Sequence, residues 1–210
     1  MPIYRLPAIA AVAAMTLLSA CSVFGGPAAP EPNYDVVRSE GSFEIRDYPE
    51  LVVVATAMSE GSSDAFGKLF DYISGANRAQ DKIAMTAPVL QSPEDSTEIA
   101  MTAPVLRGAD ADGRVEMLFV LPDDFTTETA PEPTDPSVRL STIPSRRVAV
   151  LRFSGLFRDP AIAENTKLLQ DRMQAEGLEP VGPPEAAGYN PPWTLPPLRR
   201  NEILIPIARN

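Results

Sequence analysis

The sequence predicts an α+β fold in which two similar halves share one β-sheet. Apolar runs of strand length alternate with two helical segments, and turn residues separate them. The order strand, proline, strand, helix and further strands occurs once from Phe43 and again from Val138, and residues 48–54 can be aligned with residues 143–150 with a one-residue slip. A sheet that is covered by two helices, or curled into a distorted barrel, would bury the apolar faces of both helices. A cleft between helix and sheet is then the natural position for a ligand.

Length, charge and residue content limit the classes of function. The chain has 210 residues, enough for one ordinary domain or two small ones. Acidic residues outnumber basic ones by 28 to 18, and the net charge of −10 argues against nucleic acid as a partner. Histidine is absent, which removes the most common metal ligand and general base. The chain also lacks a Gly-x-Ser-x-Gly elbow and a phosphate loop. We therefore expect a monomeric binding protein rather than an enzyme.

Residues 1–20 are predicted to be a signal peptide. Arg5 gives a positive start, and residues 8–18 are apolar apart from Thr16. A run of about eleven residues is too short to span a bilayer and is typical of a signal-peptide core. The only cysteine, Cys21, follows small residues, as in bacterial lipoprotein signals, where this cysteine is lipidated and becomes the new N-terminus. The alternative is an ordinary secretory signal with a coincidental cysteine.

Residues 21–33 are predicted to form a Pro-rich tether that is extended and mobile rather than packed. The tether would space a globular domain, residues 34–210, from a membrane surface. Ser22 is not the aspartate that retains some lipoproteins at the inner membrane, and by resemblance to that sorting rule the outer membrane is favoured. We expect a lipid-anchored protein of the bacterial cell envelope that faces the periplasm.

The first half is predicted to contain three strands and a helix. The strand candidates are residues 34–40, 43–48 and 51–56. Pro49 separates the last two as a hairpin turn would. A helix follows, because four apolar side chains recur at i, i+3, i+4 and i+7 and form one face. These residues are Phe66, Leu69, Phe70 and Ile73. Ser63 can cap the start of this helix and Gly75 its end.

The same eight residues, Ile-Ala-Met-Thr-Ala-Pro-Val-Leu, occur at 83–90 and again at 99–106. Both copies have strand length, and residues 92–96 between them have turn chemistry, so the pair predicts a hairpin. Pro88 and Pro104 cannot donate to a ladder, and each is expected to mark an edge or a bulge. A local duplication that serves packing only is the alternative.

The second half repeats the pattern of the first. Its predicted elements are strand 115–121, loop 122–136, strands 138–143 and 147–153, a helix to Glu176, loop 179–198 and strand 201–208. The two middle strands are expected to pair around Pro144. The helix begins with Asp159 as its cap and Pro160 in its first turn, and it stops at Gly177. The segment 110–113 is expected to be a hairpin turn rather than a calcium loop.

Six segments of the chain, in this order, resemble the SOUL haem-binding family in its bacterial lipoprotein form. They are residues 43–48, 70–77, 82–89, 153–155, 188–193 and 199–202, and the resemblance covers residues 34–210. Each segment is a weak signal, but together they are specific. The resemblance implies a distorted antiparallel β-barrel of two pseudo-symmetric halves flanked by two helices, in agreement with the halves inferred above.

The family resemblance implies that haem or a related tetrapyrrole binds in a shallow apolar groove between the first helix and the loop before the last strand. By motif position it assigns Phe66, Phe70 and Tyr189 to this groove. Periodicity and proximity add Leu69, Ile73 and Trp193. A porphyrin is a flat apolar plate on which aromatic side chains can stack. The alternative is that the helix residues are simply core.

Iron and the haem propionates find few obvious partners in the sequence. With no histidine, the better-placed candidates for an iron ligand are Tyr72 and Tyr189. The positions expected to pair with the propionates hold Ser63, Asp71 and Thr194, and Lys68 and Arg78 are the basic residues that can compensate. Binding would rest on apolar contact, with micromolar or weaker affinity.

Charged residues on two strands admit two readings. Glu44, Arg46, Arg199, Arg200 and Glu202 are expected to form solvated or barrel-rim ion pairs, with a catalytic carboxylate as the alternative. For the whole chain we expect a membrane-anchored haem carrier or buffer. The alternative is a module of the same fold that binds a non-haem small-molecule effector or an envelope partner.

Overall fold

The structure, a computed structural model, describes residues 29–78, 96–110 and 112–209. The predicted signal peptide, the first part of the predicted tether (residues 21–28, with Cys21) and the first copy of the repeat lie outside the described residues. In the described part, no helix is both long and apolar enough to cross a membrane.

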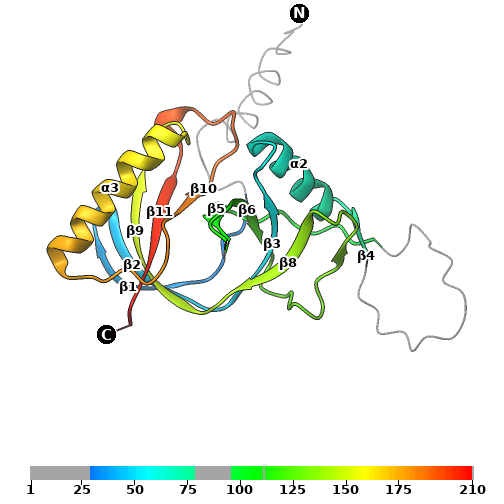
Figure 1. Cartoon of the computed structure of the whole chain (residues 1–210), viewed down its shortest axis with the longest axis horizontal. Helices are drawn as coiled ribbons and strands as arrows, with labels where there is room; N and C mark the ends of the chain where they lie inside the picture. The colour runs from blue at the N-terminus through cyan, green and yellow to red at the C-terminus, as the bar shows by residue number, and fades with distance from the viewer. Residues whose placement is uncertain (1–28, 79–95, 111, 210) are drawn as a thin grey trace, which may run out of the picture.

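One large antiparallel sheet dominates the described residues and contains nine strands in the order β1-β2-β9-β11-β10-β5-β6-β3-β8 (Figure 1). Its strands are β1 (Asp35–Glu40), β2 (Phe43–Tyr48), β3 (Leu51–Ala57), β5 (Val105–Ala109), β6 (Val115–Val120), β8 (Val138–Ile143), β9 (Arg146–Phe153), β10 (Glu185–Gly188) and β11 (Asn201–Ile207). Outside this sheet are β4 (Asn77–Arg78) paired with β7 (Glu132–Pro133), the helices α2 (Ser62–Ile73) and α3 (Asp159–Glu176), and the short helix η2 (Pro196–Leu198).

The predicted α+β halves are confirmed by the strand order. One half is β2-β3-α2-β5-β6 and the other is β8-β9-α3-β10-β11. The counterparts are β2 and β8, β3 and β9, β5 and β10, and β6 and β11. If each strand from β2 to β8 in the sheet is replaced by its counterpart, the result is the same order read from the opposite edge, as expected for two halves related by a pseudo-twofold axis. The halves also exchange their first strands, because β2 pairs with β9 and β8 pairs with β3.

The two predicted proline hairpins are therefore wrong, because β2 does not pair with β3 and β8 does not pair with β9 in the described sheet. A two-residue hairpin turn needs residues that accept positive φ, above all glycine or asparagine. Pro49–Glu50 and Pro144–Ser145 offer neither. After β2 and again after β8 the chain instead crosses to the opposite side of the sheet, and both crossings run along the lower side of Figure 1.

The barrel prediction is wrong in one respect, because the sheet is curled but not closed. Among the described strands, β1 pairs only with β2 and β8 only with β3, so these two strands are open edges. The side chains of β1 are all exposed or half-buried, so this edge strand adds no buried side chain to the core. The large antiparallel sheet with two helices remains as predicted.

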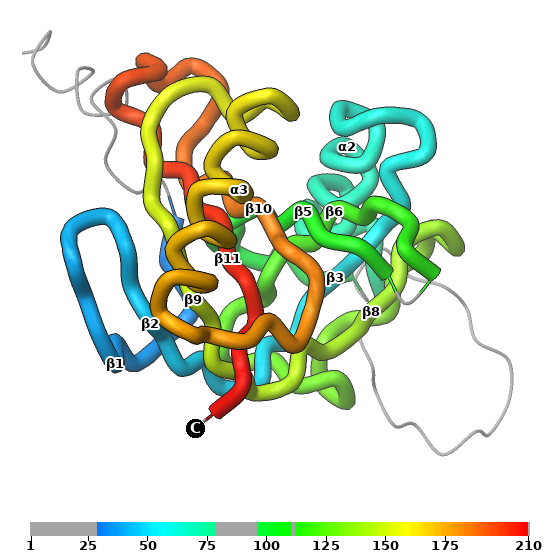
Figure 2. Tube along the Cα trace, turned by 60° about the vertical axis from the view of Figure 1, so that its left-hand side comes forward, coloured from blue at the N-terminus to red at the C-terminus, as the bar shows by residue number. Residues whose placement is uncertain are grey.

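The helices cover one face of the sheet at separate places. α2 packs on β3 and β6, and α3 packs on β9 and β11 (Figure 2). Gly177 ends α3 with φ 67°, as predicted, and Pro160 lies in its first turn, although the cap is Arg158 rather than Asp159. The start of α2 was predicted wrongly, because Gly61 is its N-cap and Ser63 already lies inside the helix.

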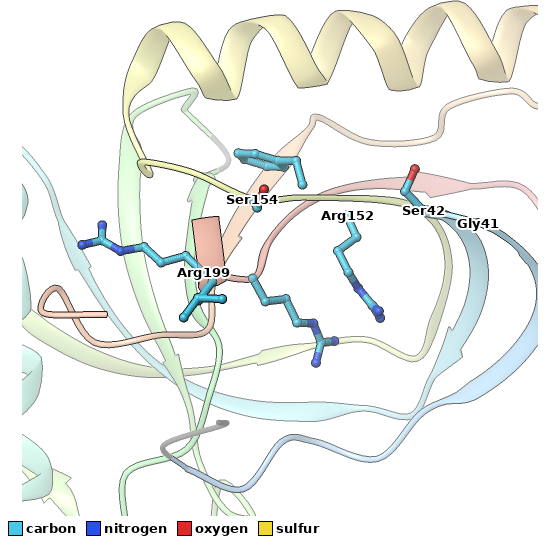
Figure 3. Close-up of a pocket in the computed structure, with 8 residues that line it drawn as sticks. Gly41, Ser42, Arg152, Ser154 and Arg199 are labelled. Carbon is cyan, nitrogen blue, oxygen red and sulfur yellow. The ribbon is translucent and has the colours of Figure 1, made fainter. Parts of the chain in front are cut away.

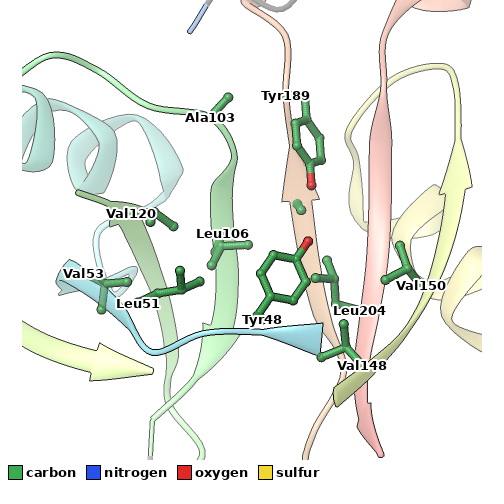
Figure 4. Close-up of a cluster of buried hydrophobic side chains, with 11 residues drawn as sticks. Tyr48, Leu51, Val53, Ala103, Leu106, Val120, Val148, Val150, Tyr189 and Leu204 are labelled. Atoms are coloured by element: carbon green, nitrogen blue, oxygen red, sulfur yellow. The ribbon is translucent and has the colours of Figure 1, made fainter. Parts of the chain in front are cut away.

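The opposite face of the sheet encloses its own apolar core, which we call the interior cluster. It contains Tyr48, Leu51, Val53, Ala103, Leu106, Val120, Val148, Val150, Ala187, Tyr189 and Leu204 (Figure 4). Strand alternation separates the faces: Val53 lies in the interior cluster, whereas its neighbour Val54 lies in the core under α2. The curl of the sheet thus brings side chains from seven of its strands together.

The second copy of the repeat is not the strand that the hairpin prediction required. Only Val105 and Leu106 belong to β5, while residues 99–104 lie outside any described ladder. Ile99 N–H donates to the carbonyl of Ile73 at 2.8 Å, and Thr102 donates to the carbonyl of Val120. The segment therefore serves packing between α2 and the sheet. The strand β10 lies inside a predicted loop, because its sequence Glu-Ala-Ala-Gly, which follows two prolines, has neither β-branched nor aromatic residues and carries little strand signal.

The described end of the tether packs, contrary to the prediction for residues 29–33. Pro32 is buried and Ala29 contacts the interior cluster. Ala103 N–H donates to the carbonyl of Pro30 at 2.8 Å. Glu31 pairs with Arg200 at 2.7 Å. We call residues 29–34 the strap, because they run across the interior face of the sheet.

Candidate ligand-binding site

Two phenylalanines of α2 form an exposed aromatic pair. Phe66 is 37% exposed and Phe70 is 45% exposed. Their ring centroids lie 6.1 Å apart with an interplanar angle of 14°. Phe66 also packs edge-on against Phe119 of β6, at 5.3 Å between centroids. The two residues lie one helical turn apart on α2, and the contact with Phe119 packs Phe66 against the core. The pair therefore offers a flat apolar surface to a ligand.

Leu69 and Ile73 lie on the buried side of the same helix. Leu69 is 0% exposed, and Ile73 is buried beside it in the core under α2. These two residues hold the helix on the sheet and do not face an open groove. The apolar spacing of the sequence could not separate them from Phe66 and Phe70, because all four fit one wide stripe.

The predicted loop residues lie in different environments. Tyr189 is buried in the interior cluster, whereas Trp193, in the segment between β10 and β11, is 65% exposed. No ring contact of the described residues joins either one to the α2 pair. Of the predicted groove residues, Phe66, Phe70 and Trp193 are therefore the exposed ones.

Neither tyrosine proposed as an iron ligand is available in this conformation. The Tyr72 hydroxyl is buried and donates to the carbonyl of Pro131 at 2.8 Å, and burial raises its pKa to about 12. The Tyr189 hydroxyl donates to Glu202 at 2.7 Å, and its pKa is raised well above 10, first by burial and then by the charge of Glu202. Among the described residues, no three His, Cys, Asp or Glu side chains gather as a metal site requires. The residues present fit a flat apolar ligand, not iron ligation through these tyrosines.

The charges beside the aromatic pair are mixed. Lys68 pairs with Asp64 at 2.8 Å and with Glu60 at 3.4 Å. The hydrogen bond to Asp64 is the largest of the effects that raise the pKa of Lys68. Ser63, Asp71 and Arg78 are exposed, while Thr194 is buried. Lys68 remains the basic group of α2 that a ligand carboxylate can approach, in competition with its two acidic neighbours.

The sequence interpretation missed a buried ion network on the interior face of the sheet. Arg46 and Glu202 are both fully buried, and the guanidinium donates to the carboxylate through two bonds of 2.8 and 2.9 Å. Arg46 also donates to Glu44 at 2.7 Å and to the Tyr48 hydroxyl at 3.2 Å. The expectation of a solvated or rim ion pair is therefore wrong for Arg46 and Glu202. The alternation of Glu44, Arg46 and Tyr48 placed them on one face, but no sequence signal marked that face as interior.

The network controls the protonation of Glu202. Burial by itself would raise the pKa of this carboxyl, but the hydrogen bonds and charge of Arg46, with Arg200 and Tyr189, lower it to about 2. Burial would likewise lower the pKa of Arg46, yet Glu202 raises it above its ordinary value. Both groups therefore stay charged at neutral pH. In Figure 4 the hydroxyl groups of Tyr48 and Tyr189 point toward each other, and each of them is hydrogen-bonded to one member of this pair.

Solved structures of similar fold exist at low sequence identity. The C-terminal domain of EcmrR matches with a TM-score of 0.54 and 12% identity, over 84% of this chain and 99% of that chain. An uncharacterized conserved protein from Listeria innocua matches with a TM-score of 0.50 and 15% identity, over 86% of this chain and 94% of that chain. Identities this low show the fold alone. Among curated proteins, no sequence matches this chain significantly.

The family comparison extends over most of the chain. The sequence profile of the SOUL heme-binding protein family matches residues 29–206. The match includes the strap, both halves of the sheet and both helices. The family takes its name from binding rather than from catalysis. The chain therefore belongs to the SOUL haem-binding protein family.

Proposed function

We propose that this protein binds haem or a related flat tetrapyrrole on the exposed aromatic face of α2, mainly by apolar contact. The observation that carries the proposal is the stacked Phe66–Phe70 pair, which stays exposed beside a buried stripe that already anchors the helix. If a fully exposed phenylalanine side chain has an accessible area of about 200 Å², the exposed parts of the two side chains add up to roughly 160 Å². Covering this area with a ligand would contribute about 4 kcal/mol to binding from the protein side. Association costs at least as much, so we expect micromolar or weaker affinity.

A haem titration of the purified chain, followed in the Soret region, tests this proposal. We expect a saturable shift at one equivalent of haem. Phe70→Asp places a charge on the contact face and should weaken binding at least about tenfold. Leu168→Asp is the matched control, because Leu168 is an exposed apolar residue, 53% exposed, on the other helix.

Two outcomes would contradict the proposal. If Soret absorbance changes without saturation as haem is added, the chain has no specific tetrapyrrole site. If Phe70→Asp and Leu168→Asp weaken haem binding equally, the binding site is not on the exposed face of α2. In either case the alternative function, a non-haem effector site or an envelope-interaction surface, gains support. The hydrogen-bonded, buried state of Tyr72 and Tyr189 already favours a ligand that needs no iron coordination.

We further propose that the protein acts as a carrier or buffer anchored to the cell envelope through a lipidated Cys21, facing the periplasm and with the outer membrane favoured. The support is the sequence of residues 1–21, with its short apolar run and single cysteine. Cys21→Ser is the test. The wild-type chain should incorporate a labelled fatty acid and sediment with membranes, and the variant should do neither. Equal labelling of both would refute lipidation at this residue.

A further inference from the structure

A shallow pocket of about 370 Å³ opens where the β1–β2 turn, the end of β9 and the segment before β11 meet (Figure 3). Its lining includes Ser42, Arg152, Ser154, Leu198, Arg199 and Arg200. Within the described residues, three arginines and no acidic residue line this pocket, although the chain has a net charge of −10. No residue of α2 takes part, so the pocket is separate from the aromatic face.

Of the three arginines that line this pocket, Arg152 has the most unused hydrogen-bonding capacity. Its side chain is 45% exposed, and its ion pairs with Glu202 and Glu44 are long, at 3.4 and 3.7 Å. Arg199 differs, because its guanidinium donates to the carbonyls of Thr194 and Pro192 and points away from Arg152 in Figure 3. Arg199 therefore contributes its stem and its long-range charge, while Arg152 can contact a ligand.

Glu202 cannot satisfy Arg152, because its acceptor sites are already used. A carboxylate offers about four lone-pair sites. Arg46 occupies two of them at 2.8 and 2.9 Å, Tyr189 a third at 2.7 Å and the Arg200 Nε–H a fourth at 2.9 Å. The contact from Arg152 is the fifth and the longest.

The contacts of Arg200 indicate that the edge of this pocket binds a carboxylate. Its Nη1 donates to both carboxylate oxygens of Glu31 in the strap, at 2.7 and 3.0 Å. A carboxylate of the chain itself thus occupies one arginine at the edge of the pocket. The neighbouring Arg152 presents the same planar donor group, and its two carboxylate contacts are longer, at 3.4 and 3.7 Å.

We propose that this pocket binds a small soluble oxyanion, a carboxylate- or phosphate-bearing molecule, through Arg152 and Arg200, and that the ligand competes with Glu31 for Arg200. The guanidinium fork matches both oxyanions. Leu198 and Phe153 are the apolar residues of the lining, and they can contact the rest of the ligand. Binding would release the Glu31 contact and so loosen the strap.

The test is calorimetric titration of the full chain with inorganic phosphate and, separately, with succinate, at constant ionic strength. The better of the two probes identifies the anion class. Arg152→Gln should weaken binding roughly tenfold or more, since it removes a charge-assisted contact. Glu31→Gln frees Arg200 and should strengthen binding. Arg114→Gln, in the β5–β6 turn and largely exposed, is the control and should bind as wild type does.

Equal binding by wild type and Arg152→Gln, or equal weakening by Arg152→Gln and Arg114→Gln, would overturn the site. If Arg152→Gln fails to fold, Glu31→Gln decides: unchanged or weaker binding overturns the competition with the strap. No heat with either anion at millimolar concentration would also overturn the proposal. The haem titration of Phe70→Asp is a separate measurement, so the two proposals fail independently.

Discussion

The buried pair of Arg46 and Glu202 gives the sharpest stability prediction. Glu202→Gln keeps the shape of the side chain but replaces a charged acceptor by an amide whose NH₂ group faces the donors of Arg46. Removing one partner of a buried ion pair costs about 3–5 kcal/mol, because the other charge stays buried without compensation. For a domain of this size, that corresponds to a drop in Tm of roughly 6–20 °C.

The pH dependence of unfolding gives a second measure of the same pair. The pKa of Glu202 falls from its ordinary value of 4.5 to about 2 on folding. A lowered folded-state pKa contributes stability above pH 4.5, and this contribution is lost as the pH falls toward 2. From the shift we expect a contribution of about 3 kcal/mol from this group. The difference in stability between wild type and Glu202→Gln should therefore shrink across this pH range.

Urea unfolding followed by circular dichroism, repeated from pH 7 down to the lowest pH at which the chain stays folded, measures both quantities. Asp171→Asn is the control, because Asp171 forms an exposed pair with Lys167 on α3 and should cost less than about 1 kcal/mol. A loss below about 1 kcal/mol for Glu202→Gln, or a difference that does not narrow with acid, would refute the reasoning.

Further predictions concern the helices. Leu69→Ala should cost about 2–5 kcal/mol by urea unfolding, because Leu69 is fully buried, while Phe70→Ala should cost less than half as much and instead weaken haem binding. Equal costs would contradict the division of α2 into a buried and a ligand face. Tyr72→Phe should cost about 1–2 kcal/mol, because the Pro131 carbonyl loses its donor, and the Soret spectrum with haem should not change; a changed spectrum would restore Tyr72 as a ligand. Gly177→Ala should destabilise by about 1 kcal/mol, because φ is 67° there, and an unchanged midpoint would contradict this.

Much of the fold could be predicted, because local signals agree with the tertiary structure. Strand β2 has its predicted bounds, β8 does as well, and the stop of α3 at Gly177 follows from glycine chemistry. The repeated element order also predicted the two halves. What failed was pairing: Pro49 and Pro144 signal a change of direction but not the partner strand. Partner choice depends on the whole sheet, which no local window contains.

The candidate site could be predicted only in part, for a related reason. Helical periodicity identified the stripe of α2 but not which members face solvent, so Leu69 and Phe70 were grouped together. The motif containing Tyr189 placed this residue in a loop, yet its hydroxyl is buried against Glu202 of β11, and its ring lies in a cluster with residues of β2 and β9, which are distant in sequence. The pairing of Arg46 with Glu202, 156 positions apart, likewise arises from β2 and β11 both flanking β9.

The most direct test of the account compares haem with iron-free protoporphyrin IX. If binding rests on apolar contact with the α2 face, the metal-free porphyrin should bind the wild-type chain with an affinity within about threefold of that of haem, and Phe66→Ala/Phe70→Ala should weaken both ligands alike. Fluorescence of the porphyrin and Soret absorbance of the haem report the two affinities. Haem binding that is at least about tenfold tighter than porphyrin binding, or binding of either ligand that survives the double substitution, would contradict the account.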